Sequence, residues 1–404
     1  MHVLLWSPGG AGDHYYGPGN FSFRMYRRRD PSRLQVSLVH GGPKQRAYPE
    51  VYESQKFLAT VTLDGWPTAG SVLAPLSRLE HYRRRVIFVR RAVRWLNKHA
   101  AKFDIFHGMG NFSDTLLPAL HAVERGLPSC TTVMSLRGEL IDQTPWRRTI
   151  GYSTRRLNLI AGLDAVVAFS RDIEQRLREG GVPEQRIVYI PNCVDPSRFR
   201  SADSSAEKNA LKQRYGLGDG PVIAFVGELT ERKAPHLIVQ ALREHARRDW
   251  QLIVAGPPNQ KSYAQGIIDL VAEQGWKDRV FFLGHIDNVE EVFRVADIYC
   301  LPSSDEGMPS ALLEAMVSGA ACVVAPFSGA RELIGDSARG RIVERSVEAL
   351  SGALGDYLGD GRLRMAHGLA AREFVLGHYT TEKVLAEYMN LFDRLKSGQT
   401  LRMD

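Results

Sequence analysis

Long apolar runs are missing from this chain of 404 residues. No run reaches the roughly 18 consecutive apolar residues that suggest a membrane-spanning helix. The first segment, MHVLLWSPGG, has no lysine or arginine before its short apolar run. This pattern predicts a first β-strand and not a signal peptide, so we expect a cytoplasmic protein.

Cysteine is scarce, and so are motifs that hold metals. The four cysteines show no C-x-x-C spacing, which argues against a disulfide framework or a cysteine metal site and fits a reducing compartment. No D-x-D motif stands in a loop. No motif interleaves aromatic and basic residues as nucleic-acid binding requires. We therefore expect no bound metal, no cofactor and no nucleic acid partner.

Charge of one sign dominates each half of the chain. Residues 1–200 hold 29 Lys and Arg against 17 Asp and Glu, whereas the remainder holds 23 against 28. A basic half joined to an acidic half predicts that the first half meets an anionic partner.

Both halves alternate strand-like and helix-like segments, a rhythm that predicts parallel, doubly wound α/β sheets. In the first half the expected strands are HVLLWS, LQVSLVH, DIFHGM, CTTVMSL, AVVAFS and IVYIP; in the second they are VIAFVG, WQLIVAG, VFFLGH, IYCLP, ACVVAP and GRIVE. The Pro/Asp/Ser-rich stretch PNCVDPSRFRSADSS separates them. We predict two Rossmann-like domains at 1–200 and 201–375 that face a central cleft, with a closing helix in 376–404 that returns to the first domain.

The segment SSDEGMPSALLEAM places two carboxylates around the start of a helix. Glu306 falls in the loop after an apolar strand, and Glu314 falls more than one turn inside the helix that follows Pro309. The carboxyl ends of parallel strands are where open α/β sheets bind ligands. Both glutamates are expected to border that crevice, although a solvated loop residue and a helix-surface residue are the alternative.

In its motifs the chain resembles the retaining glycosyltransferases of family 4, which have the GT-B architecture. The resemblance covers most of the chain and depends on the order and spacing of GVPEQRIVYIPNCVDPSRF, FVGELTERKAPHLIVQAL, VFFLGHIDNVEEVFRVADIYCLPSSDEGMPSALLEAMVSGAACVV and GARELI. The two glutamates are the E-x7-E signature of that family.

The resemblance implies a nucleoside-diphosphate sugar as donor, held mainly by the second domain. Glu314 would accept hydrogen bonds from the ribose hydroxyls. Glu306 would hold the transferred sugar, because a carboxylate accepts several strong hydrogen bonds. The other donor-binding positions implied are Gly307, Met308, Pro309 and Ser310.

The segment TERKAP provides the cations of the expected donor site. Arg232 and Lys233 follow the strand VIAFVG, and Lys233 matches the lysine of the family. Two cations can neutralise a diphosphate and stabilise it as it leaves. The family usually has an arginine where this chain has Glu228, so Arg232 is a candidate to replace the missing charge. Exposed charges at a helix start are the alternative.

The first domain matches the family less well. Gly19 in GPGNFSF resembles the glycine-rich turn that lets backbone approach phosphate, or belongs to a plain loop. His107 matches the first histidine of an H-x-H arrangement whose second position is Met109, so it is a candidate catalytic residue or a structural one. Arg137 in SLRGEL resembles a variant of polysaccharide-assembly members, which favours contact with acceptor or phosphate over a surface salt bridge.

The function implied is retaining transfer of a sugar to a saccharide or lipid-linked acceptor in polysaccharide or glycolipid assembly, without a metal. The leaving phosphate would accept the proton of the acceptor, so no strong general base is needed. An inactive or partner-dependent subunit is the main alternative, because Glu228, Met109 and Arg137 depart from the family pattern. A nucleotide-sugar epimerase, which would need no acceptor, is a further alternative.

The basic segment HYRRRVIFVRRAVRWLNKHAAK predicts an amphipathic helix. Its apolar stripe consists of Val86, Val89, Val93 and Leu96, and its basic face of Arg84, Arg91, Arg94 and Lys98. Such a helix suits the anionic inner face of the cell membrane, where the protein would be peripheral. A core-packing helix with a solvated arginine face is the alternative.

Overall fold

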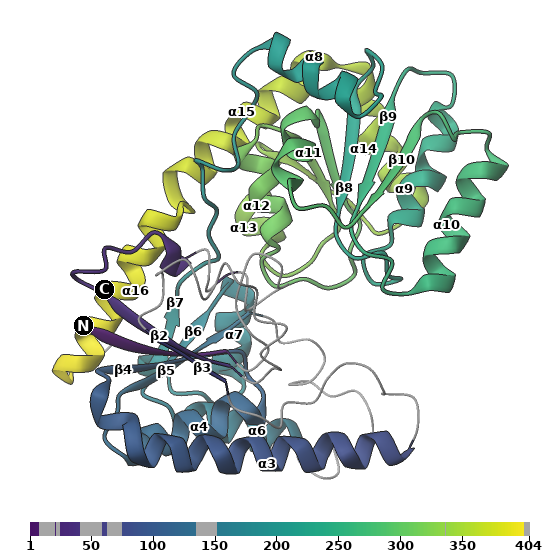
Figure 1. Ribbon diagram of the computed structural model, residues 1–404. Helices are drawn as coiled ribbons and strands as arrows, with labels where there is room; N and C mark the ends of the chain where they lie inside the picture. The colour runs from purple at the N-terminus through teal and green to yellow at the C-terminus, as the bar shows by residue number, and fades with distance from the viewer. Residues whose placement is uncertain are drawn as a thin grey trace. The chain divides into compact units, whose positions relative to one another are not determined.

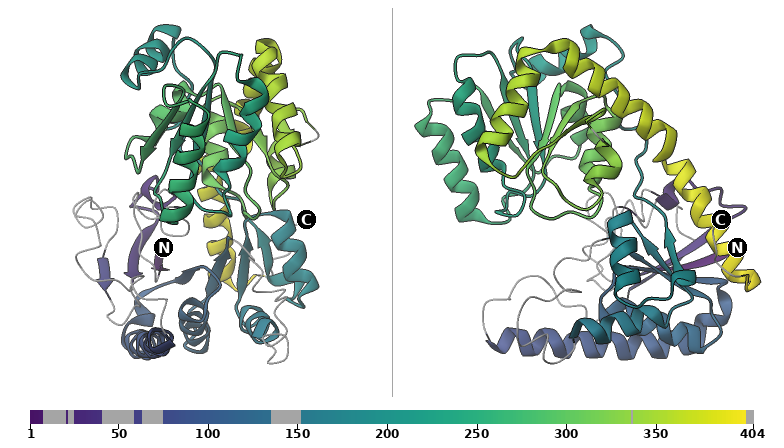
Figure 2. Two further views of the ribbon diagram at one scale, coloured as in Figure 1. Left: turned by 90° about the vertical axis from the view of Figure 1, so that its right-hand side faces the viewer. Right: turned by 180° about the vertical axis from the view of Figure 1, so that it is seen from behind.

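The computed structural model describes residues 1–7, 21, 25–40, 59–62, 75–134, 152–335 and 337–399. The chain divides into two compact units (Figures 1 and 2): unit 1 comprises Met1–Pro191 with Thr381–Asp404, and unit 2 comprises Asn192–Thr380. The C-terminal helix α16 (Thr381–Ser397) therefore packs with unit 1. Both units are α/β, as the sequence predicts.

Unit 1 contains a seven-stranded parallel sheet in the order β3-β2-β1-β4-β5-β6-β7. Its strands are β1 (His2–Trp6), β2 (Gln35–His40), β3 (Ala59–Thr62), β4 (Ile105–Met109), β5 (Ser129–Val133), β6 (Ala165–Ala168) and β7 (Ile187–Tyr189). Its other helices are α3 (Pro75–His99), α4 (Ser113–Glu124), α6 (Tyr152–Ala161) and α7 (Arg171–Glu179). Figure 1 shows α3, α4 and α6 along one face of the sheet.

Unit 2 contains a six-stranded parallel sheet in the order β10-β9-β8-β11-β12-β13. Its strands are β8 (Val222–Val226), β9 (Gln251–Ala255), β10 (Val280–Gly284), β11 (Ile298–Leu301), β12 (Ala321–Val324) and β13 (Gly340–Ile342). Its helices are α8 (Ser205–Arg214), α9 (Pro235–Ala241), α10 (Lys261–Glu273), α11 (Val289–Val295), α12 (Ser310–Val317), α13 (Ala330–Ile334), α14 (Val347–Gly359) and α15 (Gly361–His378).

The expected strands occur in both units, and β3 is an addition. Strands such as β11 and β12 are buried along their whole length, which explains their continuous apolar sequences. The short edge strand β3 is defined by its pairing with β2, in which Ser37 lies opposite Ala59. Its four residues, ATVT, carry too little apolar pattern to be recognised from the sequence.

The described part of the chain contains no helix that combines the length and the hydropathy needed to cross a lipid bilayer.

The basic helix α3 is longer than expected and buries a different stripe. Phe88, Ala92 and Leu96 are fully buried, at intervals of four residues, whereas Val86 is 51% exposed. The predicted apolar stripe is therefore wrong at Val86, because packing of α3 against α4 selects the face that carries Phe88. Arg91, Arg94 and Lys98 are exposed as predicted, and the side chain of Arg84 lies outside the described residues.

The turn between β8 and α9 contains a backbone conformation that favours glycine. Ala234, the residue before α9, has φ 51° and ψ 46° and is fully buried. A left-handed conformation costs a non-glycine residue about 1–2 kcal/mol. The strained residue directly follows Lys233, so the turn determines the direction in which the backbone leaves Lys233.

We expect Ala234→Gly to stabilise the protein by about 0.5–1 kcal/mol, because glycine removes the left-handed strain but adds freedom to the unfolded chain. Urea unfolding of both proteins measures the difference. Ala366→Gly, at an exposed position inside α15, is the matched control and should destabilise by about 1 kcal/mol. A loss of stability in both variants would contradict the account of the turn.

Candidate functional site

The carboxyl edge of the unit 2 sheet brings together charged residues from two loops. One loop joins β8 to α9 and contains Arg232 and Lys233; the other joins β11 to α12 and contains Glu306. Because β8 and β11 are neighbours in the sheet, their loops leave the same edge side by side. The structure thus places Glu306 and the two cations next to one another.

Glu306 accepts from three side chains at this edge. Its Oε1 lies 2.6 Å from Nζ of Lys233 and also pairs with Nη1 of Arg232. Ser303 donates its hydroxyl to the same oxygen at 2.8 Å. The side chain of Glu306 is only 11% exposed, so the group is a largely buried carboxylate held by two cations.

These partners keep Glu306 ionised. Burial would raise the pKa of the Glu306 carboxyl, but the charges of Lys233 and Arg232 and the hydrogen bonds from Lys233 and Ser303 outweigh burial and lower it below its usual value. A partly accessible carboxylate that stays charged is suited to accept hydrogen bonds from hydroxyl groups of a ligand.

Arg232 also connects the two loops through the backbone. Its guanidinium donates to the carbonyl of Asp305 at 2.7 Å, and its own carbonyl accepts from the backbone N–H of Ser304 at 2.9 Å. Lys233 makes no comparable backbone link among the described residues: there, its ammonium pairs with Glu306 alone.

Two further residues support the β11–α12 loop and were not singled out from the sequence. Asn192 donates its amide to the Met308 carbonyl at 2.8 Å and to the Ser310 hydroxyl at 3.0 Å. Gly329, with φ 75°, lies so close to the Gly307 carbonyl that a Cβ would approach it to 2.7 Å. Asn192 lies inside the motif PNCVDP, but the sequence alone does not show which loop its amide reaches.

Glu314 lies in α12 and is 4% exposed. Helix α12 begins at Ser310, with Pro309 as the residue that precedes it in an extended conformation. Tyr299 of β11 is fully buried, and no partner for its hydroxyl occurs in the part of the chain that the structure describes. Burial, and then charges that include Glu306 and Glu314, raise the pKa of Tyr299 well above its usual value.

Glu228 stands directly after the glycine that ends β8. Its carboxylate accepts a hydrogen bond of 2.8 Å from the side-chain amide of Asn259, in the loop after β9. The stem of Lys233 passes beside Gly227, since a Cβ there would be in van der Waals contact with Cε of the lysine, at 3.6 Å. The loops after β8 and β9 therefore share this part of the edge.

His107 is in the core of unit 1. It is fully buried, its Nδ1 bonds to the Tyr26 hydroxyl at 2.6 Å, and its Nε2 bonds to Thr132 at 2.8 Å. Thr132 in turn bonds to Tyr388 of α16 at 2.9 Å. Both ring nitrogens are engaged inside the protein, so the geometry supports the structural interpretation of His107 and not contact with a substrate.

The remaining expected positions of unit 1 give no site. Gly19 and Arg137 lie outside the described residues, and Met109 is buried. Within the described ranges of the chain, no three His, Cys, Asp or Glu residues are grouped as a metal ion would require.

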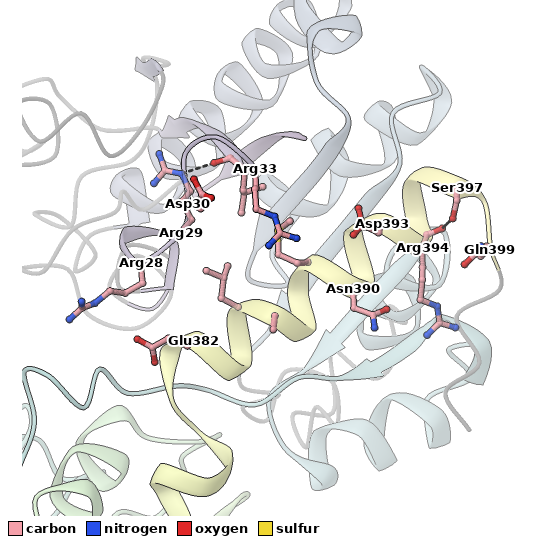
Figure 3. A pocket seen from close by; sticks show the side chains of 14 residues that line it. Arg28, Arg29, Asp30, Arg33, Glu382, Asn390, Asp393, Arg394, Ser397 and Gln399 are labelled. Atoms are coloured by element: carbon pink, nitrogen blue, oxygen red, sulfur yellow. Dashed lines mark hydrogen bonds between the residues drawn. The ribbon is translucent and has the colours of Figure 1, made fainter.

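A hollow of about 770 Å³ lies elsewhere on unit 1, between α16 and the segment that precedes β2 (Figure 3). It borders the amino end of a strand and not the carboxyl edge. Arginines such as Arg33 and Arg394 line it together with acidic residues such as Glu382 and Asp393. Charges of both signs compensate one another there, so the hollow does not match a strongly anionic ligand.

Two family models match successive parts of the chain. Residues 19–198 match the model described as Glycosyltransferase Family 4, and residues 207–374 match the model described as Glycosyl transferases group 1. Each half of the chain thus matches one glycosyltransferase model over most of its length. With its two parallel sheets the chain has the GT-B type of fold.

Curated glycosyltransferases are similar over part of their length. The chain is 32% identical to the D-inositol 3-phosphate glycosyltransferase of Nocardia farcinica over 57% of this chain and 53% of that protein. It is 30% identical to the GDP-mannose-dependent alpha-(1-6)-phosphatidylinositol monomannoside mannosyltransferase of Mycolicibacterium smegmatis, over 54% of this chain and 58% of that protein. The matches thus span little more than half of these relatives.

Solved structures share the fold of both units of the chain. A glycosyltransferase from Rickettsia africae superposes with a TM-score of 0.76 at 16% identity, over 98% of each chain. HepE from Anabaena, solved in complex with UDP, gives a TM-score of 0.76 at 15% identity, over 97% of this chain and 100% of that one. At these identities the likeness concerns the fold alone.

The buried histidine predicts how stability depends on pH. Burial lowers the pKa of His107 to about 3, so the unfolded chain binds this proton more readily than the folded one. Between about pH 6.5, the value of a free histidine, and about pH 3, His107 therefore removes stability as the pH falls. His107→Gln should therefore make the stability of the protein fall less steeply with pH over this window. Thermal unfolding at several pH values measures this.

His121→Gln, on a partly exposed histidine of unit 1, is the matched control for that experiment. It should leave the slope near that of the unmodified protein. If His107→Gln changes the stability by the same amount at every pH, the histidine is not buried in its neutral form.

Proposed function

We propose that this chain is a retaining glycosyltransferase that moves a sugar from a nucleoside-diphosphate donor to a saccharide or lipid-linked acceptor. The observation that carries the proposal is the cluster of Glu306, Lys233 and Arg232 at the carboxyl edge of the unit 2 sheet. The names of the relatives, among them a lipopolysaccharide core mannosyltransferase of Rhizobium leguminosarum, support an acceptor in glycolipid or polysaccharide assembly.

The donor is held by unit 2 in this proposal. Lys233 binds the diphosphate, because its ammonium ends a flexible stem and has one charged partner to exchange. Glu306 accepts hydrogen bonds from the hydroxyls of the transferred sugar, and Glu314 accepts from the ribose. The backbone of Gly307, Met308, Pro309 and Ser310 completes the contact with the donor.

The departure of the diphosphate is the step that Lys233 assists. As the bond from the sugar to phosphate breaks, negative charge grows on the leaving oxygen, and a positioned ammonium stabilises that charge. The proton of the acceptor hydroxyl passes to the same phosphate, so transfer occurs on the face that the diphosphate leaves and configuration is retained. No residue of the chain is required as a strong base.

The acceptor binds to unit 1 in this proposal, because the basic composition of this unit suits an anionic partner. The exposed face of α3, with Arg91 and Arg94, would lie against anionic lipid. Since Phe88 and Leu96 of this helix are buried inside the unit, the contact would depend on charge and not on insertion of an apolar face.

Glu306→Gln should lower transfer by roughly two orders of magnitude, because it removes a charged acceptor that acts on the reacting sugar. Release of nucleoside diphosphate in the presence of acceptor measures this. Glu231→Gln, an exposed carboxylate of the β8–α9 loop, is the control and should remain active. If the unmodified chain releases nothing from any nucleotide sugar, it is an inactive or partner-dependent subunit.

Glu314→Gln should weaken binding of the nucleoside diphosphate roughly ten- to a hundredfold, since a hydrogen bond to a charged group contributes about 1.5–3 kcal/mol. Binding of inorganic pyrophosphate, which has no ribose, should change little. Calorimetry with both ligands gives the comparison. Equal losses for the two ligands would mean that Glu314 does not contact the ribose.

A further inference from the structure

Arg232 and Lys233 are adjacent in the sequence and pair with the same carboxylate, but the structure holds them differently. Nη1 of Arg232 bonds to Glu306, to the Asp305 carbonyl at 2.7 Å and to the Ser303 hydroxyl at 3.4 Å. Every one of these acceptors belongs to the β11–α12 loop. Turning Nη1 toward a phosphate would break all three bonds.

Lys233 has no such set of bonds. Among the described residues its ammonium pairs with Glu306 alone, at 2.6 Å, and its stem passes beside Gly227 without a neighbouring side chain at that position. The flexible four-carbon stem of lysine allows the ammonium to move from a carboxylate to a phosphate without movement of the backbone. The same ligand would thus find one cation ready to exchange and the other fixed.

We propose that Arg232 is a positioning residue, which keeps the Glu306 carboxylate oriented toward the transferred sugar, and that Lys233 is the cation that exchanges Glu306 for the donor diphosphate. This inference rests on the proposed function. It replaces the expectation that Arg232 takes over the phosphate contact of the arginine missing at Glu228.

The exchange has a consequence for charge. While Lys233 binds the diphosphate, Arg232 and Ser303 remain with Glu306, so the buried carboxylate is never left without a cation. Without Arg232, the Glu306 carboxylate would lose the partner that fixes its orientation. A donor that carries a sugar would then lose its contact with Glu306, whereas a free nucleoside diphosphate has no such contact to lose.

The experiment compares two ligands that differ by the sugar. Calorimetry with UDP and UDP-glucose, and with GDP and GDP-mannose, is run on the unmodified chain, Arg232→Gln, Arg232→Lys and Lys233→Gln. Arg232→Gln should weaken binding of the nucleotide sugar about tenfold and binding of the nucleoside diphosphate less than twofold, and kcat should fall. Lys233→Gln should weaken binding of both ligands. Arg232→Lys should not rescue, because the lysine side chain is one bond shorter and its nitrogen does not reach the position that Nη1 occupies between Asp305 and Glu306.

Arg176→Gln is the matched control, because it removes one arginine of an exposed ion pair in unit 1 and should leave both affinities unchanged. If Arg232→Gln weakens UDP or GDP as much as Lys233→Gln does, Arg232 is a phosphate ligand and the inference is overturned. It is also overturned if Arg232→Gln changes neither ligand.

A measurement without ligand separates this inference from the proposed function. The charged groups that act on Glu306 are Lys233 and Arg232, and the carboxylate in turn acts on Tyr299 of β11. Arg232→Gln should raise the folded-state pKa of Glu306 toward its value in the unfolded chain, so the loss of stability that this carboxyl causes on acidification should become smaller. The double variant with Glu306→Gln should lose this shift.

If that shift is missing, Arg232 does not control the carboxylate, whatever the activity of the chain. If the shift is present but no nucleotide sugar binds to the unmodified protein, the proposed function fails and the role of Arg232 toward Glu306 remains.

Discussion

A buried carboxylate that needs two cations organises the carboxyl edge of unit 2. Glu306 is 11% exposed, and taking such a charge out of water is costly unless opposite charges accompany it. Lys233 and Arg232 supply them from the loop after β8, while the carboxylate comes from the loop after β11. The ion pairs therefore fix the relative position of two loops that are about seventy residues apart in the sequence.

The geometry of the surrounding loops follows from the same requirement. Lys233 reaches Glu306 from a turn in which the next residue, Ala234, has a left-handed conformation, and its stem passes beside Gly227. On the other side, Asn192 and the missing Cβ of Gly329 hold the backbone at Met308 and Gly307. Each of these features involves backbone, so side-chain chemistry alone would not have placed the cluster.

The buried polar residues of unit 1 form uncharged hydrogen bonds, in contrast to the ion pairs of unit 2. The chain of hydrogen bonds from Tyr26 through His107 and Thr132 to Tyr388 lies inside the core and joins β4, β5 and α16. Its members are uncharged, since burial lowers the pKa of His107 and raises that of Tyr26. Such a network holds α16 against the sheet, which is a structural task and leaves no group free for a substrate.

The sequence by itself determined the elements and much of the site in unit 2. Periodicity gave the parallel strands because residues buried on both faces form continuous apolar runs, and the order of motifs placed Glu306, Lys233 and Arg232 at strand ends. Only the tertiary structure decided what these residues touch. The burial of His107, the exposure of Val86, the pairing of β3 and the attachment of Arg232 to Asp305 all depend on neighbours distant in the sequence, and no local pattern records them.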